Sequence, residues 1–443
     1  MSRRRGTRPS MFAAPRLEDV LGRENGFGIL RLTMALAVIC AHSMPLGLGL
    51  PDLGHDESRG QTNVGGIAVC GFFVISGLLI TRSGMRLTPA RYGWNRAIRI
   101  FPAFWVCLAL TAFVMAPLVA YHQGRLDSFW SHPAGPWEYL EANWTLATSQ
   151  LGISGLLDHN PHPGVFNGAL WSLPYEVACY IAVAVLAGLG ILQRARWLVF
   201  LAMVAAYAWL VSIAVDFPGL RAPQYASGGL GNWNLPMLGL VNADMFLILA
   251  FMFGLGALAE LYRHRVRMNG LLALLALVVF VATFHYGGLT VFGLPAFAYL
   301  VVYLAARMPW PLTRVGSKVD LSYGVYIYGF PAQQGLALLK VGQHGYAVFT
   351  ALSLALAVVA AFFSWHLIEK PALKLKNLSY PHLPWRTKAT GPEGPVLVTS
   401  RQAPLPDPGF SFWVRPAKRP QPTWPGDDWP QQATADQWQD TRQ

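Results

Sequence analysis

The sequence predicts an all-α polytopic membrane protein with about ten transmembrane helices and both termini in the cytoplasm. Three observations predict this fold. Apolar runs of about 20 residues recur along the chain, only 13% of the residues are charged against about 25% in soluble domains, and basic connections alternate with non-basic ones. We divide the chain into a basic N-terminal segment (1–27), a membrane domain (28–377) and a Pro-rich tail (378–443) that we expect to be disordered in the cytoplasm.

Ten apolar runs supply the candidate spans, each near the length of about 20 residues that a bilayer requires. They cover approximately 28–47, 64–82, 98–120, 168–190, 196–215, 240–260, 270–285, 290–307, 320–341 and 346–368. The seventh to ninth runs are short or interrupted by Gly and Pro. No apolar segment precedes residue 28, so we expect the first run to serve as its own signal.

The connections between these runs alternate in charge. Basic residues gather in the N-terminus, in 81–99, 193–196, 262–267 and 307–318, and after Lys370. The connections 51–60, 121–167 and 216–239 contain few basic residues. The positive-inside rule therefore places both termini in the cytoplasm and favours an even number of spans. Because the net charge of +12 is divided among these short clusters, we do not expect a nucleic-acid-binding face.

Cysteine and histidine usage indicates neither disulfides nor a metal site. The four cysteines lie inside apolar runs, at Cys40, Cys70, Cys107 and Cys179. The stretch HNPH (159–162) contains two histidines but lacks further ligands, so we expect no metal there. It belongs to the long connection 121–167, which is rich in Trp, His and Pro and is a candidate functional lid.

Two ionisable residues in the first run are expected to share one helix face. The stretch RLTMALAVICAH places Arg31 and His42 eleven positions apart, which is three turns plus about 20° and about 16 Å along a helix. Arg31 lies near the cytoplasmic end, whereas His42 lies beyond the bilayer centre. We expect His42 to face a polar cavity and take part in chemistry. The alternative is a packing histidine bonded to a backbone carbonyl.

A carboxylate in the fourth run is expected at the same depth as His42. In NGALWSLPYEVACY (167–180), Glu176 lies roughly 13 Å below the outer surface if the membrane core is about 30 Å thick. Glu176 would then line the same cavity and orient His42. The alternative is a packing carboxyl unrelated to His42. Pro174 is expected to open the helix nearby.

Two arginines lie at the start of the third span. In RYGWNRAIRIFP (91–102), Arg96 and Arg99 are three positions apart and share a helix face. Such a pair at the cytoplasmic end of a membrane cavity would suit a phosphate-rich ligand. Ordinary positive-inside charge explains the pair equally well.

Six stretches, in this order, resemble the acyltransferase 3 family of integral-membrane acyltransferases. They are RLTMALAVICAH (31–42), GGIAVCGFFVISGLLI (65–80), RYGWNRAIRIFP (91–102), NGALWSLPYE (167–176), LSYGVYIYGFP (321–331) and SWHLIEKP (364–371). Together they cover most of a ten-span core at approximately 28–375. The resemblance implies transfer of an acyl group, and many members of the family O-acetylate bacterial lipopolysaccharide, exopolysaccharide or related glycans.

The resemblance also implies roles for individual residues. The family's presumed catalytic histidine matches His42, and its paired arginines implicated in acyl-donor handling match Arg96 and Arg99. The expected catalytic residues are His42 and Glu176, the expected acyl-CoA-binding residues are Arg31, Arg96 and Arg99, and the candidate substrate pocket comprises Trp171, Ser172 and Tyr323.

This chain departs from the family pattern at two positions. Many members have an acidic residue directly after the first-span histidine, where this chain has Ser43, and many have histidine where Gly329 stands. A histidine–aspartate dyad is therefore not assumed, and Glu176 becomes the expected partner of His42. Some members carry an additional extracytoplasmic hydrolase-like domain. We recognise none here, so we expect the membrane core to act alone or with a separate protein.

These observations lead us to expect a membrane O-acyltransferase of the bacterial inner (plasma) membrane. It would move an acyl group, in the first instance acetyl, from cytoplasmic acyl-CoA to a hydroxyl of a cell-surface or exported glycan. Acyl-CoA would be a donor substrate, with no permanently bound cofactor. The expected partners are the lipid bilayer, acyl-CoA and the glycan acceptor, without nucleic acid, and the oligomeric state stays open.

Three alternatives remain. A proton-coupled transporter of small molecules or glycans would also bury His42 and Glu176. A non-catalytic subunit of a polysaccharide-assembly machine would need the long loop or the tail but not His42. Within the enzyme class, succinyl or another short acyl group would replace acetyl, and both direct transfer and a covalent acyl-enzyme are compatible with the sequence.

Overall fold

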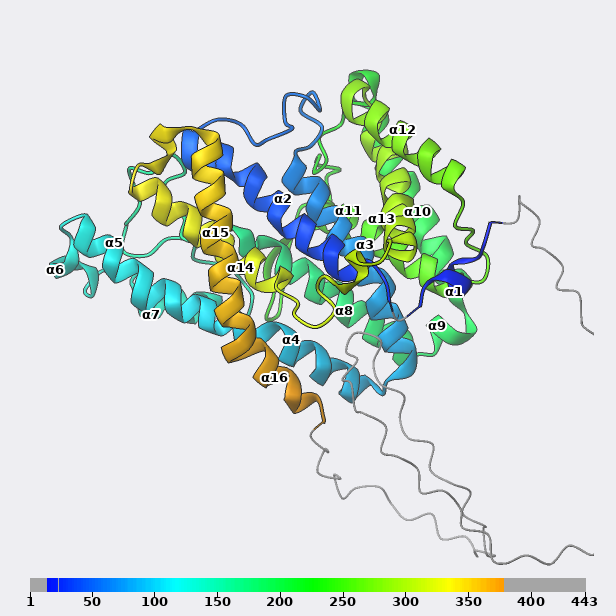
Figure 1. The fold of residues 1–443 in the computed structure, drawn as a ribbon, viewed down its shortest axis with the longest axis horizontal. Helices are drawn as coiled ribbons and strands as arrows, with labels where there is room; N and C mark the ends of the chain where they lie inside the picture. The colour runs from blue at the N-terminus through cyan, green and yellow to red at the C-terminus, as the bar shows by residue number, and fades with distance from the viewer. Residues whose placement is uncertain (1–13, 23, 378–443) are drawn as a thin grey trace, which may run out of the picture. The chain divides into compact units, whose positions relative to one another are not determined.

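Helices occupy all ten of the runs that were expected to cross the membrane (Figure 1). The computed structural model describes residues 14–22 and 24–377. The ten segments are α2 (Phe27–Leu48), α3 (Val64–Arg86), α4–η1–α5 (Pro89–Leu110, Thr111–Met115, Ala116–His122), η2–α8 (Gly168–Ser172, Leu173–Gly188), α10 (Arg196–Val215), α11 (Ala243–Leu261), α12 (Gly270–Tyr286), η4–α13 (Leu289–Gly293, Leu294–Arg307), α14 (Ser322–Leu338) and α15–η7–α16 (Tyr346–Ser364, Trp365–Glu369, Lys370–Lys374). The expected tail (378–443) and most of the basic N-terminal segment lie outside the described residues.

Among the described residues, eight of these segments are long and apolar enough to cross a membrane. The other two, α12 and α14, have 17 residues each, which is at the short end for a span. The protein is therefore an all-α, multi-pass membrane protein. The number of crossings and the side on which the termini lie stay predictions.

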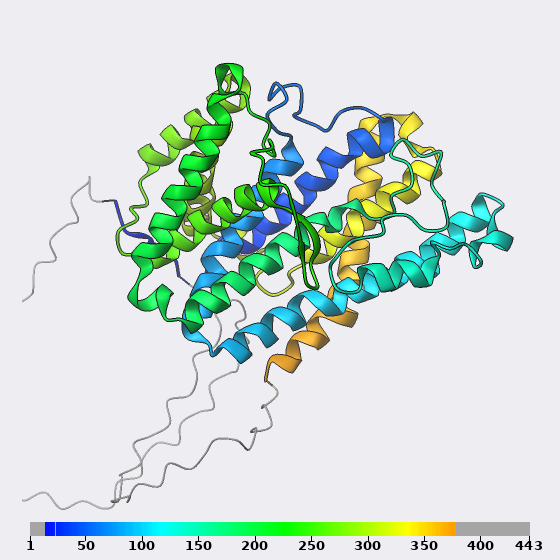
Figure 2. The same ribbon diagram turned by 180° about the vertical axis from the view of Figure 1, so that it is seen from behind.

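Short elements fill the connections. They are α1 (Leu17–Val20), α6 (Leu126–Phe129), α7 (Pro136–Asn143), α9 (Ile191–Arg194), the 3₁₀ turns η3 (Pro218–Leu220), η5 (Leu312–Arg314), η6 (Val341–His344) and η8 (Leu375–Asn377), and an antiparallel hairpin of β1 (Asn232–Leu235) and β2 (Gly239–Asn242). Figure 2 shows this hairpin, which precedes α11. The long connection 121–167 thus contains helical turns that its sequence does not reveal.

Pro174 lies in the first turn of a helix and does not interrupt one. Residues Gly168–Ser172 form a 3₁₀ turn, and α8 starts at Leu173, which places Pro174 in its first turn. Proline is well tolerated there because the first-turn N–H groups have no helical acceptor. The expectation that Pro174 breaks the fourth span was wrong, because the regular helix does not extend above it.

Small residues allow α3 and α11 to cross very closely. A Cβ on Gly77 would collide with the carbonyl of Phe253, and a Cβ on Gly256 would collide with the carbonyl of Val74. The two helices therefore meet reciprocally, backbone to backbone, as expected for small residues in a membrane-spanning helix. Nearby, Arg82 and Glu260 join the same two helices by two hydrogen bonds of 2.9 and 2.7 Å, with both side chains buried.

Gly256→Ala is expected to destabilise the protein. The added methyl group has no space against the α3 backbone, and overpacking of this kind costs about 1–3 kcal/mol of unfolding free energy. Gly93→Ala in α4 is the matched control, because its Cβ would enter open space and alanine favours a helix. Thermal unfolding of the purified proteins in detergent measures both. Equal melting temperatures for the two variants would contradict the close crossing.

Candidate active site

Four charged residues from different elements meet at one end of the helices. Arg99 in α4 contacts Asp320 (Nη2 to Oδ2, 2.7 Å) and Glu369 in η7 (Nη1 to Oε2, 3.1 Å). Arg31 in α2 contacts the same Asp320 oxygen at 3.2 Å. We call Arg31, Arg99, Asp320 and Glu369 the inner ion cluster, because the four lie on the side of the helices that is expected to face the cytoplasm.

Hydrogen bonds and aromatic rings complete the inner ion cluster. The free oxygen of Asp320 accepts bonds from the backbone and hydroxyl of Ser322, at 3.2 and 2.6 Å. The Arg99 guanidinium lies 5.8 Å from the ring centre of Tyr323. Asp320 lies in the connection before α14, and burial alone would raise its pKa. The guanidinium groups of Arg31 and Arg99 outweigh burial and lower that pKa to about 2.

Arg96 differs from its neighbour Arg99 because it makes no ion pair in the part of the chain that the structure describes. Its Nε is buried and has no hydrogen-bond partner there, and the Nε of Arg31 is in the same condition. The inner ion cluster contains two guanidinium groups and two carboxylates, whose formal charges cancel. Arg96 is therefore the uncompensated cation of the three arginines that were expected to bind acyl-CoA.

His42 pairs with an aspartate that the sequence analysis did not identify. Its Nδ1 lies 3.3 Å from Oδ1 of Asp52, in the connection between α2 and α3. The side chain of Asn63 donates to the other oxygen of Asp52 at 3.4 Å and caps the start of α3 by accepting from the Gly66 N–H at 2.7 Å. Both His42 and Asp52 are partly accessible, with 25% and 30% of their side chains exposed. The Nε2 atom of His42 has no carboxylate partner among the described residues, so it is available to accept a proton.

Ser43 and Gly329, the two positions that depart from the pattern the resemblance implies, lie where α2 and α14 pack together beside His42. Buried Gln333 donates to the Ile39 carbonyl at 2.8 Å and to the Ser43 hydroxyl at 3.0 Å, so α14 and α2 are tied together beside His42. A Cβ on Gly329 would lie 2.8 Å from Cγ1 of Ile39. A histidine at position 329 therefore does not fit this packing.

The long connection 121–167 contacts the part of α14 that packs against α2 beside His42. Gln334 donates to the carbonyls of His162 and Val165 at 2.8 and 2.7 Å, and Asn160 donates back to the Gln334 side chain at 2.7 Å. The ring of Phe330 lies between two imidazoles, 5.8 Å from His42 and 6.0 Å from His162. The HNPH stretch thus lies next to the candidate catalytic histidine.

Glu176 does not contact His42 in this structure. Its Oε1 accepts hydrogen bonds from Ser76 in α3 at 2.7 Å and from Tyr180, one turn along α8, at 2.5 Å. The expected pairing of Glu176 with His42 is therefore absent, and Asp52 takes the position beside the imidazole. Asp52 was missed because contact with it depends on the path of a surface loop.

The candidate substrate-pocket residues divide between two places. Ser172 shares a 2.6 Å hydrogen bond with Tyr326, and Trp171 packs edge-on against Tyr225 at 5.8 Å. Tyr323 instead donates to the Ile100 carbonyl at 2.9 Å and joins the inner ion cluster through its ring. The three residues therefore do not form one pocket wall.

Asp320 and the partner of Glu369 were also not predicted. The partner of Glu369 is Arg99 in the middle of α4. Asp320 directly precedes the LSY stretch. Asp320 could have been identified from the sequence by its position as an acidic residue at the start of an otherwise apolar run.

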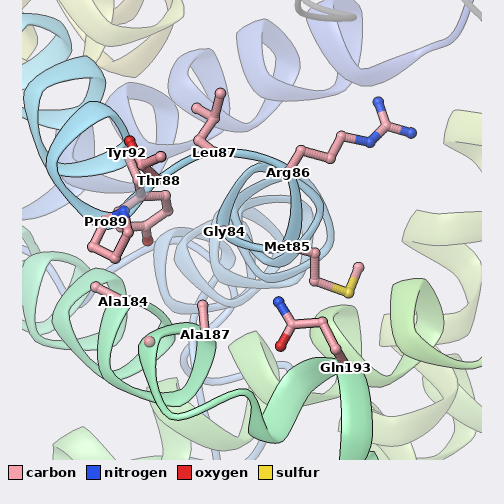
Figure 3. Close-up of a pocket in the computed structure, with 11 residues that line it drawn as sticks. Gly84, Met85, Arg86, Leu87, Thr88, Pro89, Tyr92, Ala184, Ala187 and Gln193 are labelled. Atoms are coloured by element: carbon pink, nitrogen blue, oxygen red, sulfur yellow. The ribbon is translucent and has the colours of Figure 1, made fainter. Parts of the chain in front are cut away.

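A cavity of about 330 Å³ lies between the α3–α4 turn, α8 and α9 (Figure 3). None of the expected site residues lines it. Figure 3 shows the Arg86 side chain pointing away from Met85 and Gln193, which line the same cavity. Tyr92 in its wall is one helical turn from Arg96 on α4.

Comparison with known proteins identifies relatives over most of the chain. The acyltransferase 3 family, described as an acyltransferase domain, matches residues 24–366. An "O-acetyl transferase" of Shigella phage Sf6 is 27% identical over 356 residues, covering 79% of this chain and 96% of the relative. "Nodulation protein 10" of Rhizobium leguminosarum bv. viciae is 28% identical over 388 residues, covering 82% and 97%. No solved structure matches the chain significantly.

Asp320→Asn is expected to destabilise the protein strongly. It leaves Arg31 and Arg99 without their shared carboxylate, and breaking a buried pair costs about 3–5 kcal/mol. Asp158→Asn removes the exposed partner of Arg125 and should leave thermal stability nearly unchanged, because exposed ion pairs contribute little. Thermal unfolding in detergent compares the two variants. Equal stability would show that the inner ion cluster does not hold the helices together.

Proposed function

Because the chain belongs to the acyltransferase 3 family and is thus a membrane-embedded acyltransferase, we propose that it transfers an acetyl group from acyl-CoA to a hydroxyl of a surface glycan. The observation that carries this proposal is His42 beside Asp52, on the same helix that brings Arg31 to the inner ion cluster. The phage relative named as an O-acetyl transferase supports acetyl as the group and oxygen as the acceptor. The resemblance of the six motifs supports a glycan acceptor and a bacterial inner membrane.

His42 is proposed as the general base. With the Nδ1 proton directed at Asp52, Nε2 removes the proton from the acceptor hydroxyl. The acceptor oxygen attacks the thioester carbonyl, the carbon–sulfur bond breaks, and the imidazolium returns the proton to the leaving CoA thiolate. The products are an ester and free CoA. The 3.3 Å separation from Asp52 is long for a hydrogen bond, and such contacts shorten when substrate is bound.

Arg96 is proposed as the principal contact for the phosphates of acyl-CoA. Of the three arginines, Arg96 is the one that has no carboxylate partner among the described residues. Its buried Nε also has no hydrogen-bond acceptor there. Arg31 and Arg99 support the same end of the site through the inner ion cluster, and the free Nε of Arg31 offers a further donor. The acyl-bearing arm would then span the distance of about 16 Å along α2 to His42.

Glu176 is proposed to act on substrate rather than on His42. The hydroxyls of Ser76 and Tyr180 both donate to Oε1 of Glu176, and Oε2 accepts no hydrogen bond from the described part of the chain. A fixed carboxylate of this kind can accept a hydrogen bond from an acceptor hydroxyl. The transporter alternative relied on a shared role for His42 and Glu176. The absence of contact between them, together with the family, leaves it without support.

His42→Ala is expected to abolish acylation. A general base contributes about 10²–10⁴-fold to the rate, and alanine retains no group that accepts the proton. Surface glycans from cells carrying the intact protein, the variant or neither are compared by mass spectrometry, with membrane insertion verified by immunoblot. The proposal fails if a normally inserted variant acylates glycans as the intact protein does, or if removal of the protein leaves glycan mass unchanged.

Asp52→Asn is expected to lower kcat at least about tenfold while leaving KM for acyl-CoA nearly unchanged. An amide cannot stabilise the imidazolium that forms during proton transfer, and Asp52 is distant from the arginines. Asp56→Asn in the same loop is the control, because Asp56 is exposed and has no contact with His42. Acyl transfer by the purified proteins measures both constants. An equal kcat for the two variants would remove Asp52 from the mechanism.

Arg96→Gln is expected to raise KM for acyl-CoA roughly 10- to 100-fold with little loss of stability. The magnitude follows from losing one hydrogen bond to a charged group, and Arg96 has no ion pair to break. Arg99→Gln should instead lower thermal stability, because it leaves Glu369 without an ion pair and Asp320 with Arg31 alone. The assignment is wrong if Arg96→Gln binds acyl-CoA normally.

A further inference from the structure

A second, larger cavity lies between three helices away from the candidate active site. It has a volume of about 490 Å³, within the range of about 300–1,000 Å³ that is typical of ligand pockets. Its walls come from α10, α11 and α13 and the connection after α11, through Phe200, Leu255, Leu258, Ala259, Tyr262, Arg265, Val266, Pro295, Ala298, Tyr299 and Val302. Most of these side chains are apolar, and we call this cavity the lipid groove.

The lipid groove opens at the perimeter of the helices. Phe200 in its wall is 49% exposed, and the same outer side of α10 presents Trp197, Leu201 and Val204, each about half exposed. In a multi-pass membrane protein, such apolar residues are expected to face hydrocarbon. Because the hydrocarbon core of a bilayer contains no water, an apolar groove that opens toward it suits an acyl chain.

Two arginines lie at the basic end of the groove. Arg196 and Arg265 place their guanidinium carbons 5.4 and 5.9 Å from the ring centre of Tyr262. Neither makes an ion pair among the described residues, although Arg196 donates to the Leu261 carbonyl at 3.2 Å. The neighbouring acid Glu260 is already neutralised by Arg82 at 2.7 Å. The mouth therefore carries uncompensated positive charge.

The loop that carries Arg265 is held in place by the N-terminal segment. The Leu17 N–H donates to the Val266 carbonyl at 2.8 Å, and the Met268 N–H donates to the Pro15 carbonyl at 2.8 Å. The buried side chain of Leu17 anchors α1 against the helices. These backbone hydrogen bonds to the N-terminal segment therefore fix the loop that carries Arg265.

We propose that the lipid groove binds one anionic glycerophospholipid, independently of the acyl-transfer reaction. One acyl chain lies against α10, α11 and α13, and the phosphate lies between Arg196 and Arg265. The connection 262–267 is one of the basic loops that are expected to face the cytoplasm, which matches the anionic leaflet. Basic pockets between transmembrane helices on that side bind anionic headgroups for the same reason.

The test compares lipid retention by native mass spectrometry. The purified full chain is exchanged into detergent containing phosphatidylglycerol or phosphatidylcholine with the same acyl chains. The intact protein should retain phosphatidylglycerol preferentially. The double variant Arg196→Gln/Arg265→Gln should retain roughly 30-fold less, about fivefold per arginine, and Arg86→Gln at the α3 terminus should behave like the intact protein.

A second variant examines the groove itself. Ala259→Phe fills the apolar wall while leaving both arginines in place, so it should reduce retention of both lipids. Equal retention of the two lipids by the intact protein would overturn the proposal, as would undiminished retention of phosphatidylglycerol by either variant. Gel filtration identifies misfolded protein. If the double variant does not fold, Arg265→Gln alone and Ala259→Phe decide the outcome.

Discussion

The inner ion cluster is the interaction on which the rest of the structure depends. Arg31 and Arg99 lie in segments that enter the membrane, where an unpaired charge is costly. Asp320 and Glu369 compensate them, and the four residues come from α2, α4, η7 and the connection before α14. Four elements that are remote in sequence are thereby fixed relative to one another. The position of His42 follows from this, because the helix that ends in the cluster also carries the imidazole.

The two chemical tasks are separated along α2. In the proposed mechanism, Arg31 and the inner ion cluster support the donor end of the site, and His42 with Asp52 lies about 16 Å away along the same helix. The hydrogen bonds between Gln334 and the 121–167 connection bring a polar loop to the end with the base. Under the proposed function, this arrangement would keep the thioester away from bulk water while the acceptor approaches from the opposite side.

The helices could be predicted from the sequence because a run of about 20 apolar residues is local information. The shared helix face of Arg31 and His42 could be predicted for the same reason. The partners of these residues could not, because they depend on contacts between remote segments. Arg99 and Asp320 are separated by 221 positions, and Asp52 reaches His42 only because Asn63 holds the loop between α2 and α3. Glu176 had a suitable depth, but depth along one helix says nothing of the direction that its side chain takes.

The packing of Gly329 against Ile39 has an evolutionary consequence. A chain with this backbone cannot accommodate a histidine at position 329 through one substitution, because the side chain would enter space that Ile39 occupies. A smaller residue at position 39 must come first or together with it. The two positions are therefore expected to covary among homologues, with glycine opposite a large residue and histidine opposite a small one.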